Sequence, residues 1–163
     1  MKRAITAVLV VAAIAALVLW VPTVKHAVVT PTVVHAQNGN AGCSPANLRG
    51  PYAVSRQGTL LTSVLGLPAP APWGEVALAD FDGAGAFSGK ANVNIGGVAI
   101  NASFTGTYTI NIDCTGNITV HPNVPAPVTI TESIVVIGGG RQYVGTDMDS
   151  FSVVQTRAER IGD

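Results

Sequence analysis

Charged side chains are scarce in this sequence of 163 residues, where aspartate, glutamate, lysine and arginine together make up 11%. Three of the nine basic residues, Lys2, Arg3 and Lys25, lie within the first 36 positions, whereas all nine acidic residues lie after them. The chain beyond residue 36 therefore has six basic and nine acidic residues, a net charge of −3. It has no basic surface with which to neutralise phosphates. We expect no nucleic-acid partner.

Histidine and cysteine are rarer still, which limits the sites that the chain can build. There are three histidines and two cysteines, and His121 is the only histidine after residue 36. A structural metal site takes about four ligands, and a catalytic triad needs a positioned imidazole, whereas His121 precedes Pro122 at the end of a predicted strand. We predict no metal, no cofactor and no catalytic residue. Asp147 and Asp149 are interpreted as turn residues that face water.

The first 36 residues have the order of a secretory signal peptide. A basic start ends at Arg3, residues 4–21 carry no charge, and the sequence VHA ending at Ala36 resembles a cleavage site. We predict an exported protein, periplasmic or extracellular, from which residues 1–36 are removed. Two alternatives remain open, namely an uncleaved membrane anchor through residues 4–21 and a lipid-modified Cys43.

Both cysteines, Cys43 and Cys114, lie in the part of the chain that would be exported. Two cysteines in an oxidising compartment most simply pair. A bridge here would close a loop of about 70 residues, worth roughly 4 kcal/mol in the chain-entropy model. We predict a structural disulfide between them. It would tie residues 37–47, a polar segment interpreted as a flexible arm, to the turn after a central strand.

Apolar and polar residues alternate with period two over most of the chain after Arg49, and no helical period is convincing. Glycine-containing turns separate the runs, as in hairpins, and Gly58, Gly89 and Gly106 suit the bends of a closing sheet. We predict an all-β domain over residues 48–160, an antiparallel up-and-down barrel of about eight strands, with a β-sandwich as the alternative. The strands are expected at 52–60, 73–81, 87–95, 100–112, 117–121, 127–137, 141–146 and 150–157.

The segment from Leu61 to Trp73 joins the first two predicted strands and differs from both. Its sequence, LTSVLGLPAPAPW, is apolar and rich in proline, and it fits neither a strand nor a helix. We interpret it as a loop packed into one end of the barrel. The alternative is a lid over a cavity, in which case Leu65, Leu67 and Trp73 would be its covering side chains.

Two glutamates fall on the apolar face of predicted strands. Glu75 shares its face with alanines and a phenylalanine, and Glu132 lies between isoleucines in the same alternation. A charge inside a barrel is paired or has a shifted pKa. Each glutamate is therefore a candidate acid or base, or the partner of Arg56 or Arg157 in a structural ion pair. The candidate polar groups of a cavity are Arg56, Glu75, Tyr108 and Glu132.

Four patches of sequence follow one another in a characteristic order. They are CSPANLRGPYAVSRQG at 43–58, FDGAGAFSG at 81–89, TGTYTINIDCTG at 105–116 and TRAER at 156–160. Together they resemble a group of small exported bacterial proteins with an allene oxide cyclase-like barrel. The resemblance implies an eight-stranded antiparallel barrel of the calycin type, without an assigned activity. Allene oxide cyclase itself closes a fatty-acid epoxide in an apolar cavity, and related bacterial barrels close polyketide rings.

Three functional hypotheses follow from the sequence. The first is an exported barrel that binds a small apolar ligand in its lumen or beneath the loop before Trp73. The second is a cyclase or isomerase acting on an apolar substrate, which needs an open cavity with buried ionisable groups. The third is a structural or interaction protein that uses its threonine- and asparagine-rich strand faces or an exposed strand edge. The identity of a ligand and the oligomeric state stay open.

Overall fold

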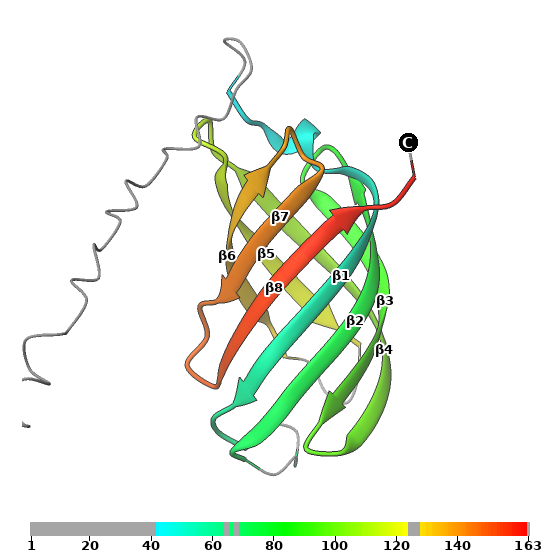
Figure 1. The fold of residues 1–163 in the computed structure, drawn as a ribbon, viewed down its shortest axis with the longest axis vertical. Helices are drawn as coiled ribbons and strands as arrows, with labels where there is room; N and C mark the ends of the chain where they lie inside the picture. Colours follow the sequence, from blue (N-terminus) through cyan, green and yellow to red (C-terminus); the bar gives the residue numbers. More distant parts are fainter. Residues whose placement is uncertain (1–41, 64–65, 67–68, 124–127, 163) are drawn as a thin grey trace, which may run out of the picture. The chain divides into compact units, whose positions relative to one another are not determined.

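The protein forms a closed antiparallel β-barrel, in a computed structural model that describes residues 42–63, 66, 69–123 and 128–162 (Figure 1). Its strands are β1 (Arg49–Leu60), β2 (Ala71–Asp82), β3 (Ala86–Ile95), β4 (Val98–Ile110), β5 (Thr115–Pro122), β6 (Ile130–Ile137), β7 (Gln142–Asp147) and β8 (Ser152–Arg160). Each strand pairs with the next along the chain, and β8 pairs with β1 to close the barrel. The predicted all-β, up-and-down barrel is confirmed, and the sandwich is excluded.

The predicted signal peptide at residues 1–36 lies outside the described residues, as do residues 37–41 of the predicted arm. No helix in the described part of the chain is long and apolar enough to span a membrane.

The strands alternate buried and exposed side chains as their sequences predict. In β4, for example, Phe104 and Tyr108 are buried, whereas Thr105 and Thr107 between them are exposed. The hydroxyl-rich face therefore meets water and the apolar face fills the barrel. Several strands extend beyond the predicted limits. The most consequential extension is that of β7, which continues to Asp147 and turns this carboxylate inward.

Aromatic rings fill one half of the barrel. The ring of Phe81 lies at the centre of this group, 4.9 Å from the ring of Phe87, 5.1 Å from that of Tyr52 and 5.2 Å from that of Tyr108. The contacts with Tyr52 and Tyr108 are edge-on, a favoured arrangement for aromatic pairs. Buried aliphatic side chains from the surrounding strands complete this cluster.

Two glycines of β3 and β4 allow phenylalanine rings to lie directly against the backbone. Gly89 is paired with Phe104, and Gly106 is paired with Phe87. A Cβ atom at either glycine would come within 2.3 Å of the ring opposite. These positions exclude any larger residue, because a phenylalanine ring lies against the backbone at each of them.

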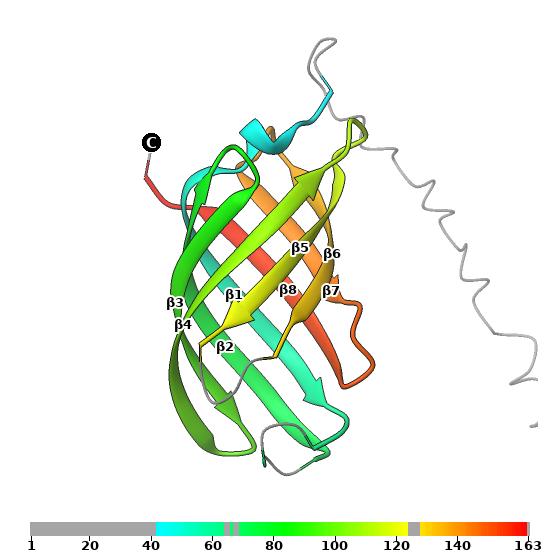
Figure 2. The ribbon, with the colours of Figure 1, turned by 180° about the vertical axis from the view of Figure 1, so that it is seen from behind.

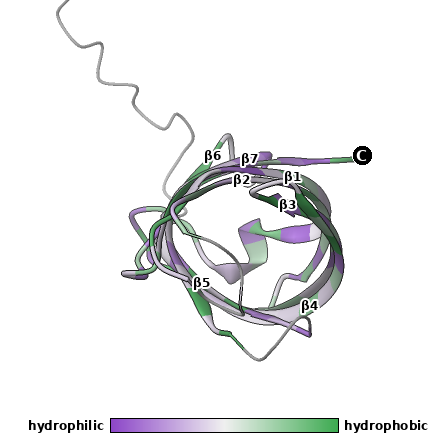
Figure 3. Cartoon of the chain, turned by 90° about the horizontal axis from the view of Figure 1, so that it is seen from below, coloured by the Kyte–Doolittle hydropathy of each residue, from purple (hydrophilic) through white to green (hydrophobic). Residues whose placement is uncertain are grey.

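A short plug, residues 43–48, lies across the end of the barrel next to the aromatic rings (Figures 1 and 3). It contains the 3-10 helix η1 (Pro45–Asn47) and the fully buried Leu48. The hydroxyl of Tyr108 donates to the carbonyl oxygens of Leu48 at 2.8 Å and Pro45 at 3.1 Å. Nη2 of Arg160 donates to the Asn47 carbonyl at 2.7 Å. This part of the predicted flexible arm is thus held in place by defined contacts.

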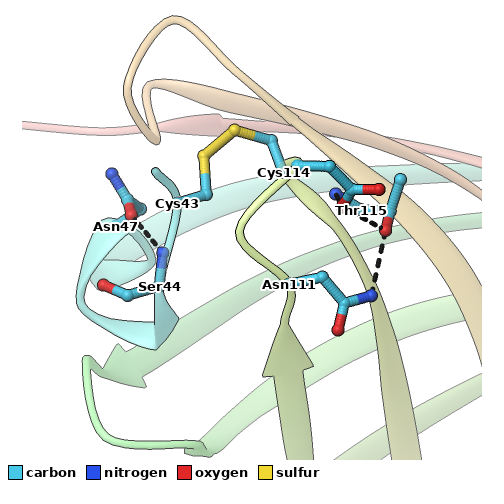
Figure 4. Close-up of a disulfide and its surroundings, with 7 residues drawn as sticks. Cys43, Ser44, Asn47, Asn111, Cys114 and Thr115 are labelled. Atoms are coloured by element: carbon cyan, nitrogen blue, oxygen red, sulfur yellow. Dashed lines mark hydrogen bonds between the residues drawn. A yellow bond between two sulfur atoms is a disulfide. The ribbon is translucent and has the colours of Figure 1, made fainter. Parts of the chain in front are cut away.

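The disulfide Cys43–Cys114 joins the plug to the turn between β4 and β5 (Figure 4). Beside it, the backbone N–H of Cys43 donates to the carbonyl of Ile112 at 3.1 Å. Cys114 adopts φ 70°, a left-handed conformation that is uncommon outside glycine, and its carbonyl accepts the N–H of Val136 at 2.9 Å. The predicted disulfide is confirmed, and it connects the plug with β4, β5 and β6.

Breaking the disulfide should lower the free energy of unfolding by about 4 kcal/mol, because a bridge between residues 71 apart restricts the unfolded chain. Urea unfolding of the oxidised protein with and without reductant measures this difference. The double variant Cys43→Ser/Cys114→Ser is the control, since reductant cannot act on it. An unfolding midpoint that reduction leaves unchanged would contradict the prediction.

Candidate functional site inside the barrel

Strand register places four ionisable side chains inside the barrel at neighbouring positions. On one side, Arg56 of β1 is paired with Glu75 of β2 and with Thr156 of β8. On the other side, Glu132 of β6 is paired with Asp147 of β7. Closure of the barrel brings these two sets together. We refer to Arg56, Glu75, Glu132 and Asp147 as the ion cluster.

The guanidinium of Arg56 contacts all three carboxylates of the ion cluster. Nη1 lies 3.1 Å from Oε2 of Glu75. Nη2 lies 2.7 Å from Oε1 of Glu132 and 2.6 Å from Oδ1 of Asp147. Nε donates to Oγ1 of Thr156 at 3.3 Å. The exposed fraction of these side chains is 9% for Glu75 and 5% or less for the other three charged residues.

Neutral side chains supply further partners to the cluster. Ser152 donates its hydroxyl to Oδ2 of Asp147 at 2.5 Å. Trp73 donates Nε1 to Oε2 of Glu75 at 3.3 Å, and the guanidinium of Arg56 lies 5.4 Å from the centre of the same indole ring. No fully buried side-chain nitrogen or oxygen in the described part of the chain lacks a hydrogen-bond partner. The cluster therefore meets the requirement that buried polar groups be paired.

The ion cluster holds one cation and three acids, a net charge of −2 when all are ionised. Burial raises the pKa of Glu132, and the nearby Asp147 and Glu75 raise it further, although Arg56 acts in the opposite direction. Burial alone would lower the pKa of Arg56, but the three carboxylates outweigh it and raise the pKa. The guanidinium consequently stays charged while Glu132 takes up a proton more readily than an exposed glutamate.

A narrow cavity of about 60 Å³ borders the cluster on the side away from the plug. Trp73, Glu75 and Arg56 form one side of it. The other side comes from β3, β4, β5 and β6, strands that are labelled in Figure 2. Ala91 and Ala102 are cross-strand neighbours on this side, so the space arises where two small side chains face the lumen. The remaining walls are mainly apolar and include Val93, Ile100, Phe104 and Val120.

A larger depression of about 490 Å³ lies on the outer face of β2 to β5, around Leu78, Lys90, Ser103 and His121. Most of its walls are outward-facing side chains, and half of the Leu78 side chain is exposed to solvent. A molecule there would keep much of its surface in water. The inner cavity is smaller, but it combines apolar walls with charged groups and is the better candidate site.

The structure brings together three of the four side chains considered as cavity polar groups. Arg56 and Glu75 line the cavity, and Glu132 lies behind them in the ion cluster. Tyr108 lies at the other end of the barrel, where its hydroxyl is bonded to the plug. Arg157, the other suggested partner for the glutamates, is exposed on the outer face of β8.

The lid prediction is not supported at Trp73, because this residue lies within β2 and its side chain packs inside the barrel beneath Arg56. Leu65 and Leu67, the other two lid candidates, lie outside the described residues.

The interpretation of Asp147 as a water-facing turn residue was wrong. Its side chain is fully buried and contacts Arg56. The missed signal was the alternation in β7, where Tyr143, Gly145 and Asp147 share one face. Asp149, which does lie in the turn, accepts the backbone N–H of Thr131 at 2.7 Å.

Comparison of this chain with known proteins finds no matching family model, no matching curated protein and no matching solved structure.

Replacing Arg56 with methionine should lower the free energy of unfolding by roughly 3 to 5 kcal/mol, because three buried carboxylates would lose their shared cation. Urea unfolding at neutral pH measures the loss. Arg157→Met, on the outer face of β8, is the matched control and should change stability by no more than about 0.5 kcal/mol. Equal effects of the two substitutions would contradict a central role for Arg56.

Glu132→Gln should flatten the pH dependence of stability above pH 4.5, the ordinary pKa of glutamate. Because burial raises the pKa of Glu132, the folded state keeps this proton to a higher pH than the unfolded chain does. The stability from this group is complete below pH 4.5 and falls as the pH rises through the folded pKa. Its charged or titratable neighbours are Arg56, Glu75, Asp147 and Tyr143.

Urea unfolding across a pH series from about pH 4 to pH 8 measures this slope. Glu159→Gln, an exposed position on β8, is the control for the loss of one negative charge. A variant that keeps the full slope of the natural protein would assign the pH dependence to another group.

Proposed function

We propose that this protein binds a small, mainly apolar molecule in the half of the barrel opposite the plug. The observation that carries this proposal is the cavity beside the ion cluster, which has apolar walls on β3, β4 and β5 and two charged side chains at one side. Small-molecule sites are concave and mainly apolar, with a few polar groups that set the orientation of the ligand. Eight-stranded barrels are also large enough to hold one small ligand.

The two halves of the barrel differ in a way that supports this location. Near the plug, aromatic rings fill the interior, and the hydroxyls of Tyr52 and Tyr108 are bonded to backbone carbonyls. In the other half, the paired alanines Ala91 and Ala102 leave space next to Arg56 and Glu75. The half that carries the disulfide is filled by side chains, and binding is assigned to the other half.

The size of the cavity restricts the ligand. An engineered apolar cavity of about 150 Å³ accepts benzene, whereas this cavity has about 60 Å³. The bound part of the ligand is therefore slender, such as an alkyl chain, rather than a ring system. The rest of the molecule would extend away from the ion cluster.

The other hypotheses receive less support from the contacts. Glu132 does not line the cavity, so Glu75 is the one carboxylate among the described lining residues, and a cyclase or isomerase would have no second acid or base beside it. The closed ladder from β1 to β8 leaves no unpaired edge among the described strands for strand addition.

An exported location is part of the same proposal. A disulfide that anchors the plug is typical of proteins that fold in an oxidising compartment. The relation to exported bacterial proteins with an allene oxide cyclase-like barrel also stays a proposal, supported by the eight-stranded meander.

Ala102→Leu should abolish binding of 1-octanol while the barrel remains folded, because the larger side chain would fill the cavity. The measurement is a titration followed by amide NMR shifts, which should concentrate on β3 and β4 around Ala102 in the natural protein. Ala99→Leu places the same substitution on the outer face of the same strand and should leave binding unchanged. Equal binding by both variants would place the octanol elsewhere and contradict the proposed site.

A further inference from the structure

The ion cluster leaves one carboxylate oxygen available at the cavity. Both hydrogen bonds that Glu75 accepts, from Arg56 and from Trp73, reach Oε2. Among the described residues, Oε1 accepts none. No fully buried side-chain oxygen in the described part of the chain lacks a partner, so Oε1 is not sealed within the packed core. Glu75 lines the cavity, and Oε1 is the oxygen of this carboxylate that no described residue occupies.

The donors of Arg56 are used differently. Nε donates to Thr156, and Nη2 contacts both Glu132 and Asp147. Nη1 contacts Glu75 alone, although it carries two hydrogens. On the side of the cavity formed by Arg56 and Glu75, one carboxylate oxygen can therefore accept hydrogen bonds, and at most one N–H can donate.

The net charge of the ion cluster also favours a ligand that donates a hydrogen bond. One guanidinium faces three carboxylates, so the region around the cavity is negative when all four groups are ionised. A ligand carboxylate would bring a fourth acid to a single cation. A ligand hydroxyl or ammonium would instead donate to a charged oxygen, which is among the stronger kinds of hydrogen bond.

We propose that the occupant of this cavity carries a hydrogen-bond donor, a hydroxyl or an ammonium group, at its inner end, and that Oε1 of Glu75 accepts it. This inference rests on the proposed binding function and names the chemical class of the ligand. An amphiphile with a slender apolar chain and a donor head group satisfies both the walls and the charged side of the cavity. The chain of a fatty acid matches the apolar walls, but its carboxylate would face the acidic side of the cavity.

Four compounds with the same eight-carbon chain test the head group: 1-octanol, n-octylammonium, octanoate and n-octyl acetate. The first two donate a hydrogen bond, and the last two only accept one at neutral pH. Titration of the intact, disulfide-bonded protein, followed by amide NMR shifts, gives each dissociation constant. We expect the two donors to bind at least about tenfold more tightly than the two acceptors.

Glu75→Gln tests the role of the carboxylate directly. Arg56 and Trp73 would hold the amide oxygen of the glutamine, which leaves its NH₂ group toward the cavity. Octylammonium, which can only donate, should therefore bind more weakly than octanoate and octyl acetate, whereas octanol, whose hydroxyl also accepts, should still bind. Glu159→Gln is the matched control, since it removes an acid that is exposed on the outer face of β8, and it should keep the donor preference.

The outcomes separate this inference from the function on which it rests. If octanoate or octyl acetate binds the natural protein as tightly as octanol does, the donor preference is overturned while apolar binding stands. If none of the four compounds shifts the amides around the cavity, the proposed binding function itself falls. The comparison of the four compounds uses the natural protein alone, so it tests the donor preference even if Glu75→Gln does not fold.

Discussion

The guanidinium of Arg56 is the interaction on which the interior of this barrel depends. It joins side chains from β1, β2, β6, β7 and β8 at one level of the lumen. Each carboxylate there would be costly to bury alone, and the one guanidinium contacts all three. Burial raises the pKa of Glu132, and the surplus of acid raises it further. The same surplus sets the sign of the charge beside the cavity.

The two halves of the barrel on either side of this cluster are filled in different ways. Toward the plug, aromatic rings pack against one another and against the backbone at Gly89 and Gly106. Toward the other end, aliphatic side chains and Trp73 form a separate cluster, and the paired alanines leave a cavity. The ion cluster thus separates a filled, disulfide-bonded half from one with room for a ligand.

Much of the barrel could be predicted from the sequence, because period-two alternation is a local signal that survives in nearly every strand. The same alternation predicted that Glu75 and Glu132 face inward, and it suggested Arg56 as their partner. Asp147 was missed because it ends its strand, next to residues that resemble a turn. The cavity could not be predicted, since it depends on which strands face each other across the closed barrel. Register fixes neighbours such as Ala91 and Ala102, but only closure brings Arg56 to Glu132.

The pairing of β8 with β1 also has a consequence for how the protein folds. Seven of the eight strand pairs join neighbours in the chain, whereas the hydrogen bond between Arg56 and Thr156 joins residues 100 apart. Contacts between distant residues form slowly because a long stretch of chain must first be brought together. Until this last pair forms, water can still solvate the charges of the ion cluster. We therefore expect desolvation of the cluster and closure of the barrel to occur as one late event, which limits the rate of folding.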